Sequence, residues 1–229
     1  MFFALCFLFG LLFNAPLWAA TIYCDGSLAA DCTASNYSIA GRNCTGSAGN
    51  AWNTIAECDT NHGAADTVNV RTGTYTIATK ITPASNSIWQ AYNSEVVTIQ
   101  GTSPPTSSNP GTLIQIFDIS GVTVKGFILK TAWAHIIDAQ ENVAGGVCDN
   151  LVIQDNDISD WNYANTTFRY GLRLSKCKDG TVSGNYFHDP KNGSKNSSLS
   201  SVGGVSVGGG TGINLTTGGG GHSILKNTF

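Results

Sequence analysis

Short segments in which apolar and polar residues alternate recur along this chain. Four of them align without gaps, each with an apolar residue, a polar turn and a second apolar residue five places later: Val124–Leu129, Ile153–Ile158, Val182–Phe187 and Ile224–Phe229. Two earlier β-rich segments, around Val70 and Ile99, extend the series. The segments start 29, 25, 29, 29 and 42 residues apart. A period of two with Asn/Gly turns predicts β-strands and no helix inside the repeats.

A second aligned column precedes the first. It comprises Ile136–Ala139, Gly171–Leu174 and Gly212–Leu215, so each repeat holds at least two short strands. One such repeat cannot bury its apolar face alone, whereas stacking on its neighbour buries a continuous core. We therefore predict a coil of short parallel strands, with successive turns about 4.8 Å apart.

Asparagine stands at the fourth position of three aligned segments, as Asn156, Asn185 and Asn227. In a stack of turns these side chains form a ladder in which each amide bonds its neighbours. Such bonds satisfy polar groups that would cost about 1–3 kcal/mol each if they were buried without a partner.

The cysteines test the stack independently. Cys148 and Cys177 each lie five residues before an aligned segment, and so share a column in consecutive turns. The strand spacing falls within the roughly 4.4–6.8 Å that a disulfide allows between Cα atoms. The sequence predicts a Cys148–Cys177 bridge, and two stacked free thiols are the alternative.

Met1–Ala20 is an apolar run that ends in small residues. We interpret it as a signal peptide cut after Ala19 or Ala20, with a signal anchor as the alternative. Cleavage removes Cys6 and leaves six cysteines, and an even count in an exported chain favours disulfides over metal ligands. These features predict a secreted or cell-surface protein with no stable membrane span after cleavage.

Residues 21–65 are expected to form an N-terminal cap with a disulfide-rich loop and a short helix. The segment Asn50–Cys58 has Trp52 and Ile55 on one helical face and Asn50 as N-cap. Cys32 and Cys44 lie in a loop-rich stretch that their pairing would pin. Cys24 and Cys58 then pair by elimination.

The amino-acid composition limits the classes of partner that the protein can bind. Only 12% of residues are charged, and 12 Lys+Arg stand against 15 Asp+Glu. Without a basic excess to neutralise phosphates, nucleic acid is excluded as a partner. The 41% hydrophobic content also excludes a disordered chain.

The segment DTVNVRTGTY at residues 66–75 and the repeated apolar-x-x-Asn-x-apolar turns resemble the right-handed parallel β-helix family, which includes pectate lyases and related polysaccharide-active enzymes. The resemblance covers roughly Thr21 to Phe229. It implies an all-β fold, a right-handed parallel β-helix (solenoid) with a short N-terminal capping helix, in which residues 66–229 form the repeats. It also implies a secreted or surface protein that often acts on polysaccharide.

A fold does not by itself define an activity. Two hypotheses follow from different classes. In the first, a secreted β-helix protein binds an extracellular polysaccharide and cleaves it as a lyase or a glycosidase. In the second, it is a non-catalytic surface, adhesion or structural module.

One register position defines the candidate site. Asp138, Arg173 and Asn214 each stand between two inward apolar residues and are expected to form an outward row, with Asp118 beginning it. We expect this row to bind substrate together with Tyr170 and Trp133 from neighbouring loops. His135 and Arg169 lie nearby. The alternative interpretation of Asp138 and Arg173 is an ion pair between stacked turns.

Cleavage would need further groups. In a lyase, Arg173 or Lys176 would act as base or charge neutraliser, with Tyr170 or His188 as proton donor. A hydrolase needs two carboxylates about 5–9.5 Å apart, and the nearby aspartates form no cluster that the sequence can identify. Acidic loops leave calcium open as a cofactor, although no ligand spacing identifies a metal site.

The last residue, Phe229, completes an aligned segment with nothing after it to cover the stack. Natural stacks cover that end. We expect either that the sequence is truncated at its C-terminus or that the open coil mediates oligomer formation.

Overall fold

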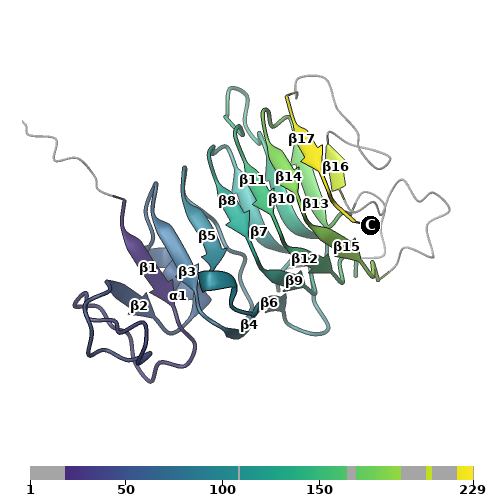
Figure 1. Ribbon diagram of the computed structural model, residues 1–229. Coiled ribbons are helices and arrows are strands. Elements are labelled where there is room, and N and C mark those ends of the chain that lie inside the picture. Colours follow the sequence, from purple (N-terminus) through teal and green to yellow (C-terminus); the bar gives the residue numbers. More distant parts are fainter. Residues whose placement is uncertain (1–18, 108, 164–168, 192–204, 208–220, 229) are drawn as a thin grey trace, which may run out of the picture.

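A computed structural model describes residues 19–107, 109–163, 169–191, 205–207 and 221–228. Within these residues the strands form three sheets, and in each sheet the strands follow one another along the length of the molecule (Figure 1). The largest sheet has the spatial order β17 (Ser223–Leu225), β14 (Thr181–Ser183), β11 (Val152–Gln154), β8 (Thr123–Lys125), β5 (Ile88–Ala91), β3 (Thr67–Val70), β1 (Thr21–Cys24) and β2 (Asn50–Trp52).

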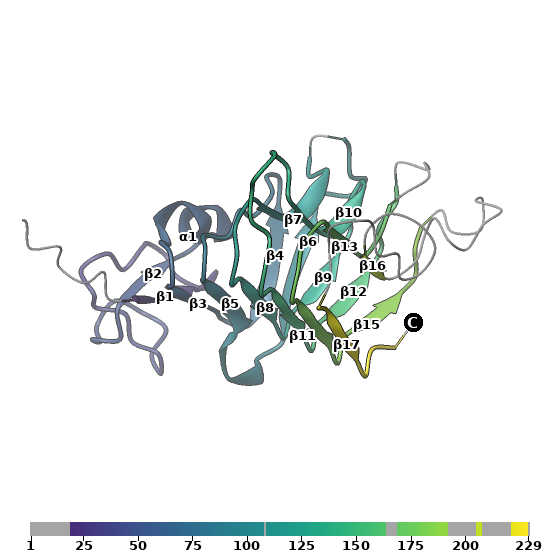
Figure 2. The ribbon, with the colours of Figure 1, turned by 90° about the horizontal axis from the view of Figure 1, so that it is seen from above.

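Two smaller sheets complete the architecture. The five-stranded sheet has the order β15 (Tyr186–His188), β12 (Asp157–Ser159), β9 (Ile128–Lys130), β6 (Val97–Gly101) and β4 (Gly73–Ile77). The four-stranded sheet has the order β16 (Val205–Val207), β13 (Leu172–Ser175), β10 (His135–Gln140) and β7 (Thr112–Phe117). Seen from above, the eight-stranded sheet forms one side of the molecule and the four-stranded sheet the other (Figure 2).

The chain visits the three sheets in a fixed order, which we call a circuit. From β5 it passes to β6 and β7, then to β8, β9 and β10, and then to β11, β12 and β13. Strands of neighbouring circuits pair in parallel. The circuit before these contains β3 and β4. In it, a parallel bridge between Ile81 and Ile114 takes the place of a strand in the four-stranded sheet. The predicted stack of short parallel strands in a mostly β chain is confirmed.

Each circuit contributes its apolar residues to one core. In the eight-stranded sheet the register aligns a column of fully or almost fully buried side chains, namely Val68, Trp89, Val124, Ile153 and Val182. Leu129, Ile158 and Phe187 form a matching column in the five-stranded sheet. Because each strand is only a few residues long, stacking on the next circuit supplies most of its buried contacts.

The predicted asparagine ladder is confirmed. The side-chain amide of Asn156 donates to Oδ1 of Asn185 over 3.0 Å, and that of Asn185 donates to Oδ1 of Asn227 over 2.9 Å. Oδ1 of each asparagine also accepts a backbone N–H of the preceding circuit: Asn156 from Phe127, Asn185 from Asn156, and Asn227 from Asn185. The ladder thus satisfies backbone and side-chain groups together at one bend of consecutive circuits.

The alignment of the early repeats is wrong in two places. Val70 is in register with Ala91, and the column of Val124 passes through Val68 instead. Ile99 lies on β6 in the five-stranded sheet, in register with Leu129, and not in the column of Val124. The column instead passes through Trp89, so that Val68, Trp89 and Val124 follow one another after 21 and 35 residues. The longer interval accommodates the Pro-rich stretch before β7, which breaks the 29-residue period.

The predicted helix exists but begins later. Asn50–Trp52 forms β2, and helix α1 spans Ile55–Asn61. Thr54 is the N-cap in place of Asn50, since its hydroxyl accepts the backbone N–H of Glu57. The Thr54–Glu57 spacing is that of a capping box. The helix packs against β1, β2 and β4 at the N-terminal end of the sheets. A short 3₁₀ turn spans Tyr92–Ser94.

All three predicted disulfides are present: Cys24–Cys58, Cys32–Cys44 and Cys148–Cys177. The Cα atoms of Cys148 and Cys177 are 4.5 Å apart, close to one strand spacing. This bridge therefore fastens two consecutive circuits. The other two hold residues 21–65, whose strand β1 pairs with β3 and so continues the eight-stranded sheet.

A polar network anchors the N-terminal loop. The buried carboxylate of Asp25 accepts hydrogen bonds from Tyr37 and Arg42. Burial alone would raise the pKa of Asp25, but these bonds and those from Ser27 hold that pKa below its usual range. Arg71 donates to Tyr37 and to both oxygens of Glu95. The network thus joins the loop to β3 and to the start of β6.

The described residues contain no helix with the length and apolar character that crossing a membrane requires. The predicted signal peptide lies outside the described residues, apart from its last two.

Candidate functional site

A row of polar side chains runs across the four-stranded sheet. Gln115 on β7 is in register with Asp138 on β10, which is in register with Arg173 on β13. Each stands between buried apolar residues on its strand, so the three side chains point away from the core. The ammonium of Lys80 donates to the amide oxygen of Gln115 and extends the row toward the N-terminal end.

Two ends of the expected row differ from the prediction. Gln115, and not Asp118, is the neighbour of Asp138. Asp118 lies in the following turn with φ of 56° and accepts the backbone amides of Asn142 and Val143. Asn214 lies outside the described residues, and the register neighbour of Arg173 is Ser206. The long interval before Ile224 made that part of the alignment ambiguous.

Asp138 and Arg173 form an ion pair. Nε and Nη2 of Arg173 donate to the two carboxylate oxygens of Asp138, each over 2.6 Å. Asp138 is only 4% exposed, while the Arg173 side chain is 28% exposed. The ion-pair interpretation is therefore confirmed, and Asp138 has both oxygens occupied inside the protein. Of the two, only Arg173 reaches solvent appreciably.

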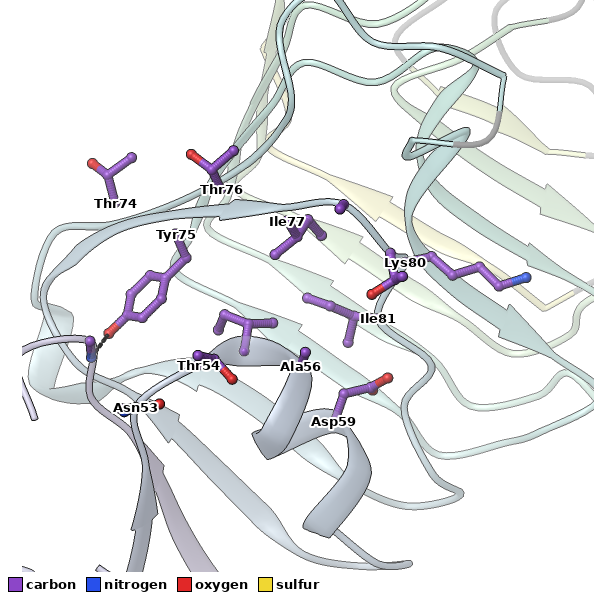
Figure 3. A pocket seen from close by; sticks show the side chains of 14 residues that line it. Asn53, Thr54, Ala56, Asp59, Thr74, Tyr75, Thr76, Ile77, Lys80 and Ile81 are labelled. Atoms are coloured by element: carbon purple, nitrogen blue, oxygen red, sulfur yellow. Dashed lines mark hydrogen bonds between the residues drawn. The ribbon is translucent and has the colours of Figure 1, made fainter. Parts of the chain in front are cut away.

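A cavity of about 410 Å³ adjoins the row, and we call it the sheet groove. It is lined by Thr79, Lys80, Ser107, Pro110, Gly111, Thr112 and Gln115. Hydroxyl, amide and ammonium groups predominate in this lining, and all of them can bond to a polyhydroxylated ligand. A second cavity, of about 460 Å³, lies between α1 and β4 and shares Thr79 and Lys80 with the groove (Figure 3).

Trp133 lies beside the groove wall. Its backbone N–H donates to the carbonyl of Pro110, and the next residue bonds to that of Gly111. Trp133 is half-buried. Of the aromatic residues expected to bind substrate, it is the one that the structure places next to a cavity.

Tyr170 and His135 stack on each other inside the protein. Their rings are 5.7 Å apart and nearly parallel, and Nδ1 of His135 accepts the backbone N–H of Tyr170. Tyr170 is 1% exposed, so its ring is not a platform for a sugar. Burial lowers the pKa of His135 to about 3, and the charges of Arg173 and Arg169 act in the same direction. His135 is therefore neutral at physiological pH.

One of the expected catalytic groups, His188, lies apart from the others. Lys176 is exposed in the turn that leaves β13, with φ of 59°. His188 lies on β15 of the five-stranded sheet and bonds to Asp157 and Asp189. Its burial lowers the pKa of His188, but the two carboxylates outweigh this and raise it overall. Arg173 and His188 thus belong to different sheets.

Lys80 and Gln115 are the groove residues that sequence reasoning missed. The signal for Gln115 was the alternation in Leu113–Phe117, which matches that of Ile136–Gln140 with its Asp138. Lys80 had no such signal, because the first circuit contributes a single bridge and no strand to this sheet.

Among the described residues, no three His, Cys, Asp or Glu side chains gather closely enough to hold a metal ion. No family model, curated protein or solved structure matches the chain. The groove is therefore interpreted from the chemistry of its own residues.

Proposed function

We propose that this protein is a right-handed parallel β-helix that acts outside the cell and binds an extracellular polysaccharide in the sheet groove. The fixed order in which the chain visits three parallel sheets and the asparagine ladder support the fold. Three disulfides are compatible with an oxidising extracellular environment.

The position of the groove across stacked strands carries this proposal. A polymer laid across the strands meets a new outward side chain about every 4.8 Å. Lys80 donates hydrogen bonds, and Gln115 and the Thr112 hydroxyl both donate and accept, which matches sugar hydroxyls. Each bond adds only about 0.5–1.5 kcal/mol, so affinity would come from repetition along the polymer.

Binding has more support than cleavage. A lyase would need a base and a proton donor beside the same sugar, but Tyr170 is buried and His188 lies on a different sheet from Arg173. A hydrolase would need two accessible carboxylates, but Asp138 is buried and paired with Arg173. These observations favour a module that binds polysaccharide without turning it over.

Binding is tested by titrating the secreted chain with neutral and acidic polysaccharides, such as xylan, β-glucan, polygalacturonate and alginate, in a calorimeter. We expect Lys80→Ala and Gln115→Ala each to weaken binding roughly three- to tenfold. Lys125→Ala and Gln154→Ala are matched controls, because they remove the same side chains from the eight-stranded sheet. They are expected to leave affinity unchanged.

Two outcomes would contradict the proposal. If no polysaccharide binds, or if the control variants weaken binding as much as the groove variants, a purely structural module is favoured. Release of reducing ends or of unsaturated products absorbing near 235 nm would instead establish cleavage. Arg173→Ala is a poor probe of function, because it leaves the buried carboxylate of Asp138 without its partner.

A further inference from the structure

Among the described residues, β4 is an edge strand with no strand beside it on one side. It pairs with β6 on one side and ends the five-stranded sheet on the other. The eight-stranded sheet continues past β3 with β1 and β2 at this end of the molecule. After β1 the chain continues from Asp25 into the N-terminal loop and forms no strand next to β4. The five-stranded sheet thus stops earlier than its neighbour.

The vacant edge presents unpaired backbone groups. The N–H of Gly73 donates to the carbonyl of Val96, so Gly73, Tyr75 and Ile77 direct their backbone groups toward β6. Thr74 and Thr76, which alternate with them, direct theirs to the opposite side. Among the described residues, neither of these two N–H groups has a hydrogen-bond acceptor. They lie about 6.6 Å apart along the strand.

The edge opens into the cavity of about 460 Å³ between β4 and α1, which we call the strand slot. Figure 3 shows Ile77 and Ile81 between the strand and the helix, while the side chains of Thr74 and Thr76 point away from the helix. Ala56 lines the helical side with a single methyl group. The slot therefore combines an apolar floor with a free strand edge, and its volume lies in the range of small-ligand sites.

We propose that the strand slot binds an extended polypeptide strand of a partner protein, which adds to the five-stranded sheet at β4. Only an extended backbone repeats donors and acceptors with the spacing of Thr74 and Thr76. The added strand would run for about three residues over this edge. A small apolar side chain between its two bonded positions would face Ile77, Ile81 and the methyl group of Ala56.

The backbone contribution is tested with a peptide that has the sequence of β6, Val97–Gly101, flanked by lysines and labelled with a fluorophore. Thr76→Pro removes the edge-facing N–H but no backbone bond to β6, at a position where sheets tolerate proline. It also removes the hydroxyl that accepts a hydrogen bond from Gln100, and Thr76→Ala removes the same hydroxyl. Thr76→Ala is the matched control, because it removes the side chain and keeps the N–H. We expect the dissociation constant of the peptide to rise roughly three- to tenfold in Thr76→Pro relative to Thr76→Ala.

A second pair of variants does not depend on the backbone of β4. Ala56→Arg fills the slot from the surface of α1 and is expected to abolish peptide binding. Asn61→Arg places the same side chain on the exposed helix surface outside the slot, about 140° around the helix axis from Ala56, and is expected to leave binding intact. Unchanged melting temperatures establish that each variant is folded.

Three results would overturn the proposal. One is equal affinity of the peptide for Thr76→Pro and Thr76→Ala together with no effect of Ala56→Arg. Another is undiminished binding of a peptide methylated at alternate backbone nitrogens. The third is self-association of the chain that Thr76→Pro abolishes while the peptide does not bind, which would identify a second copy as the occupant.

Discussion

Asn156 and Asn185 are 29 residues apart in sequence, yet their side chains are joined by a hydrogen bond of 3.0 Å inside the protein. Oδ1 of Asn185 also accepts the backbone N–H of Asn156, and each Nδ2 donates to a carbonyl of the preceding circuit. One residue therefore satisfies polar groups of two circuits. The ladder fixes the register of the stack, because a shift by one residue would leave these buried groups unpaired.

Asn185→Ala is expected to destabilise the protein by about 2–4 kcal/mol. The substitution leaves the N–H of Asn156 without an acceptor, removes one of the two acceptors of Asn156 Nδ2, and leaves the carbonyl of Ile153 without this donor. Each buried unsatisfied group costs about 1–3 kcal/mol. Urea-induced unfolding followed by circular dichroism measures the loss.

The control for the ladder is Asn142→Ala, because Asn142 is exposed in a turn. It should change stability by less than about 0.5 kcal/mol. Asn185→Asp is informative as well, since a carboxylate accepts the bonds but cannot donate to Ile153. A change below about 0.5 kcal/mol for Asn185→Ala would show that the ladder contributes nothing to stability.

Arg173→Ala is expected to cost about 2 kcal/mol of unfolding free energy. The value lies between the 0–1 kcal/mol of exposed ion pairs and the roughly 3–5 kcal/mol lost when a buried pair is broken. The intermediate figure follows because Asp138 is buried but Arg173 is partly exposed. The double variant Asp138→Ala/Arg173→Ala should be more stable than Arg173→Ala alone, since it removes the stranded carboxylate. Equal stability of the two would contradict this.

Stability should fall on acidification because of His135. Its pKa is about 3 in the folded protein and about 6.5 in an unfolded chain, so the unfolded state binds the proton more readily. The stabilisation is complete above pH 6.5 and is lost as the pH falls toward 3. Between pH 7 and pH 4 the loss from this group is about 3 kcal/mol. Urea titrations at a series of pH values measure the slope.

The variant His135→Gln tests the origin of that slope. Its amide oxygen accepts the N–H of Tyr170 but does not titrate, so the fall between pH 6.5 and 4 should become much shallower. His188→Gln is the control. His188 has a raised pKa. Its contribution to the free energy of unfolding is therefore present below pH 6.5 and is lost as the pH rises above that value. An unaltered acid slope in His135→Gln would assign the effect to other groups.

Much of the fold could be predicted from the sequence because the repeat length is constant in the central part of the stack. From Val124 to Val182 successive circuits are 29 residues long, and this constancy revealed the asparagine ladder and the Cys148–Cys177 bridge. Before Val124 the loop lengths vary, so alternation alone could not distinguish which sheet a strand joins. That is why Ile99 was placed in the column that Trp89 occupies.

The candidate site was harder to predict from the sequence than the fold, because it depends on which side chains are buried and on which loops lie next to each other. The register of Asp138 and Arg173 was predicted correctly, yet alternation could not show that Asp138 would be buried. The partner of an outward residue depends on strand order. Lys80 reaches Gln115 across 35 residues of sequence without any repeated pattern to connect them. Helix α1 began late because Asn50–Trp52 pairs with β1 as a strand.

The Cys148–Cys177 bridge is expected to stabilise the circuits that it joins. It closes a loop of 29 residues, and the chain-entropy model assigns about 3–4 kcal/mol to such a loop. In a stack where each circuit contacts only its neighbours, the effect of removing it should stay local. Cys148→Ala/Cys177→Ala is therefore expected to speed amide hydrogen exchange in β11 and β14. Cys32→Ala/Cys44→Ala, which opens the N-terminal loop, should leave exchange in those strands unchanged. Equal acceleration in β11 and β14 by both double variants would mean that the stack unfolds as one unit.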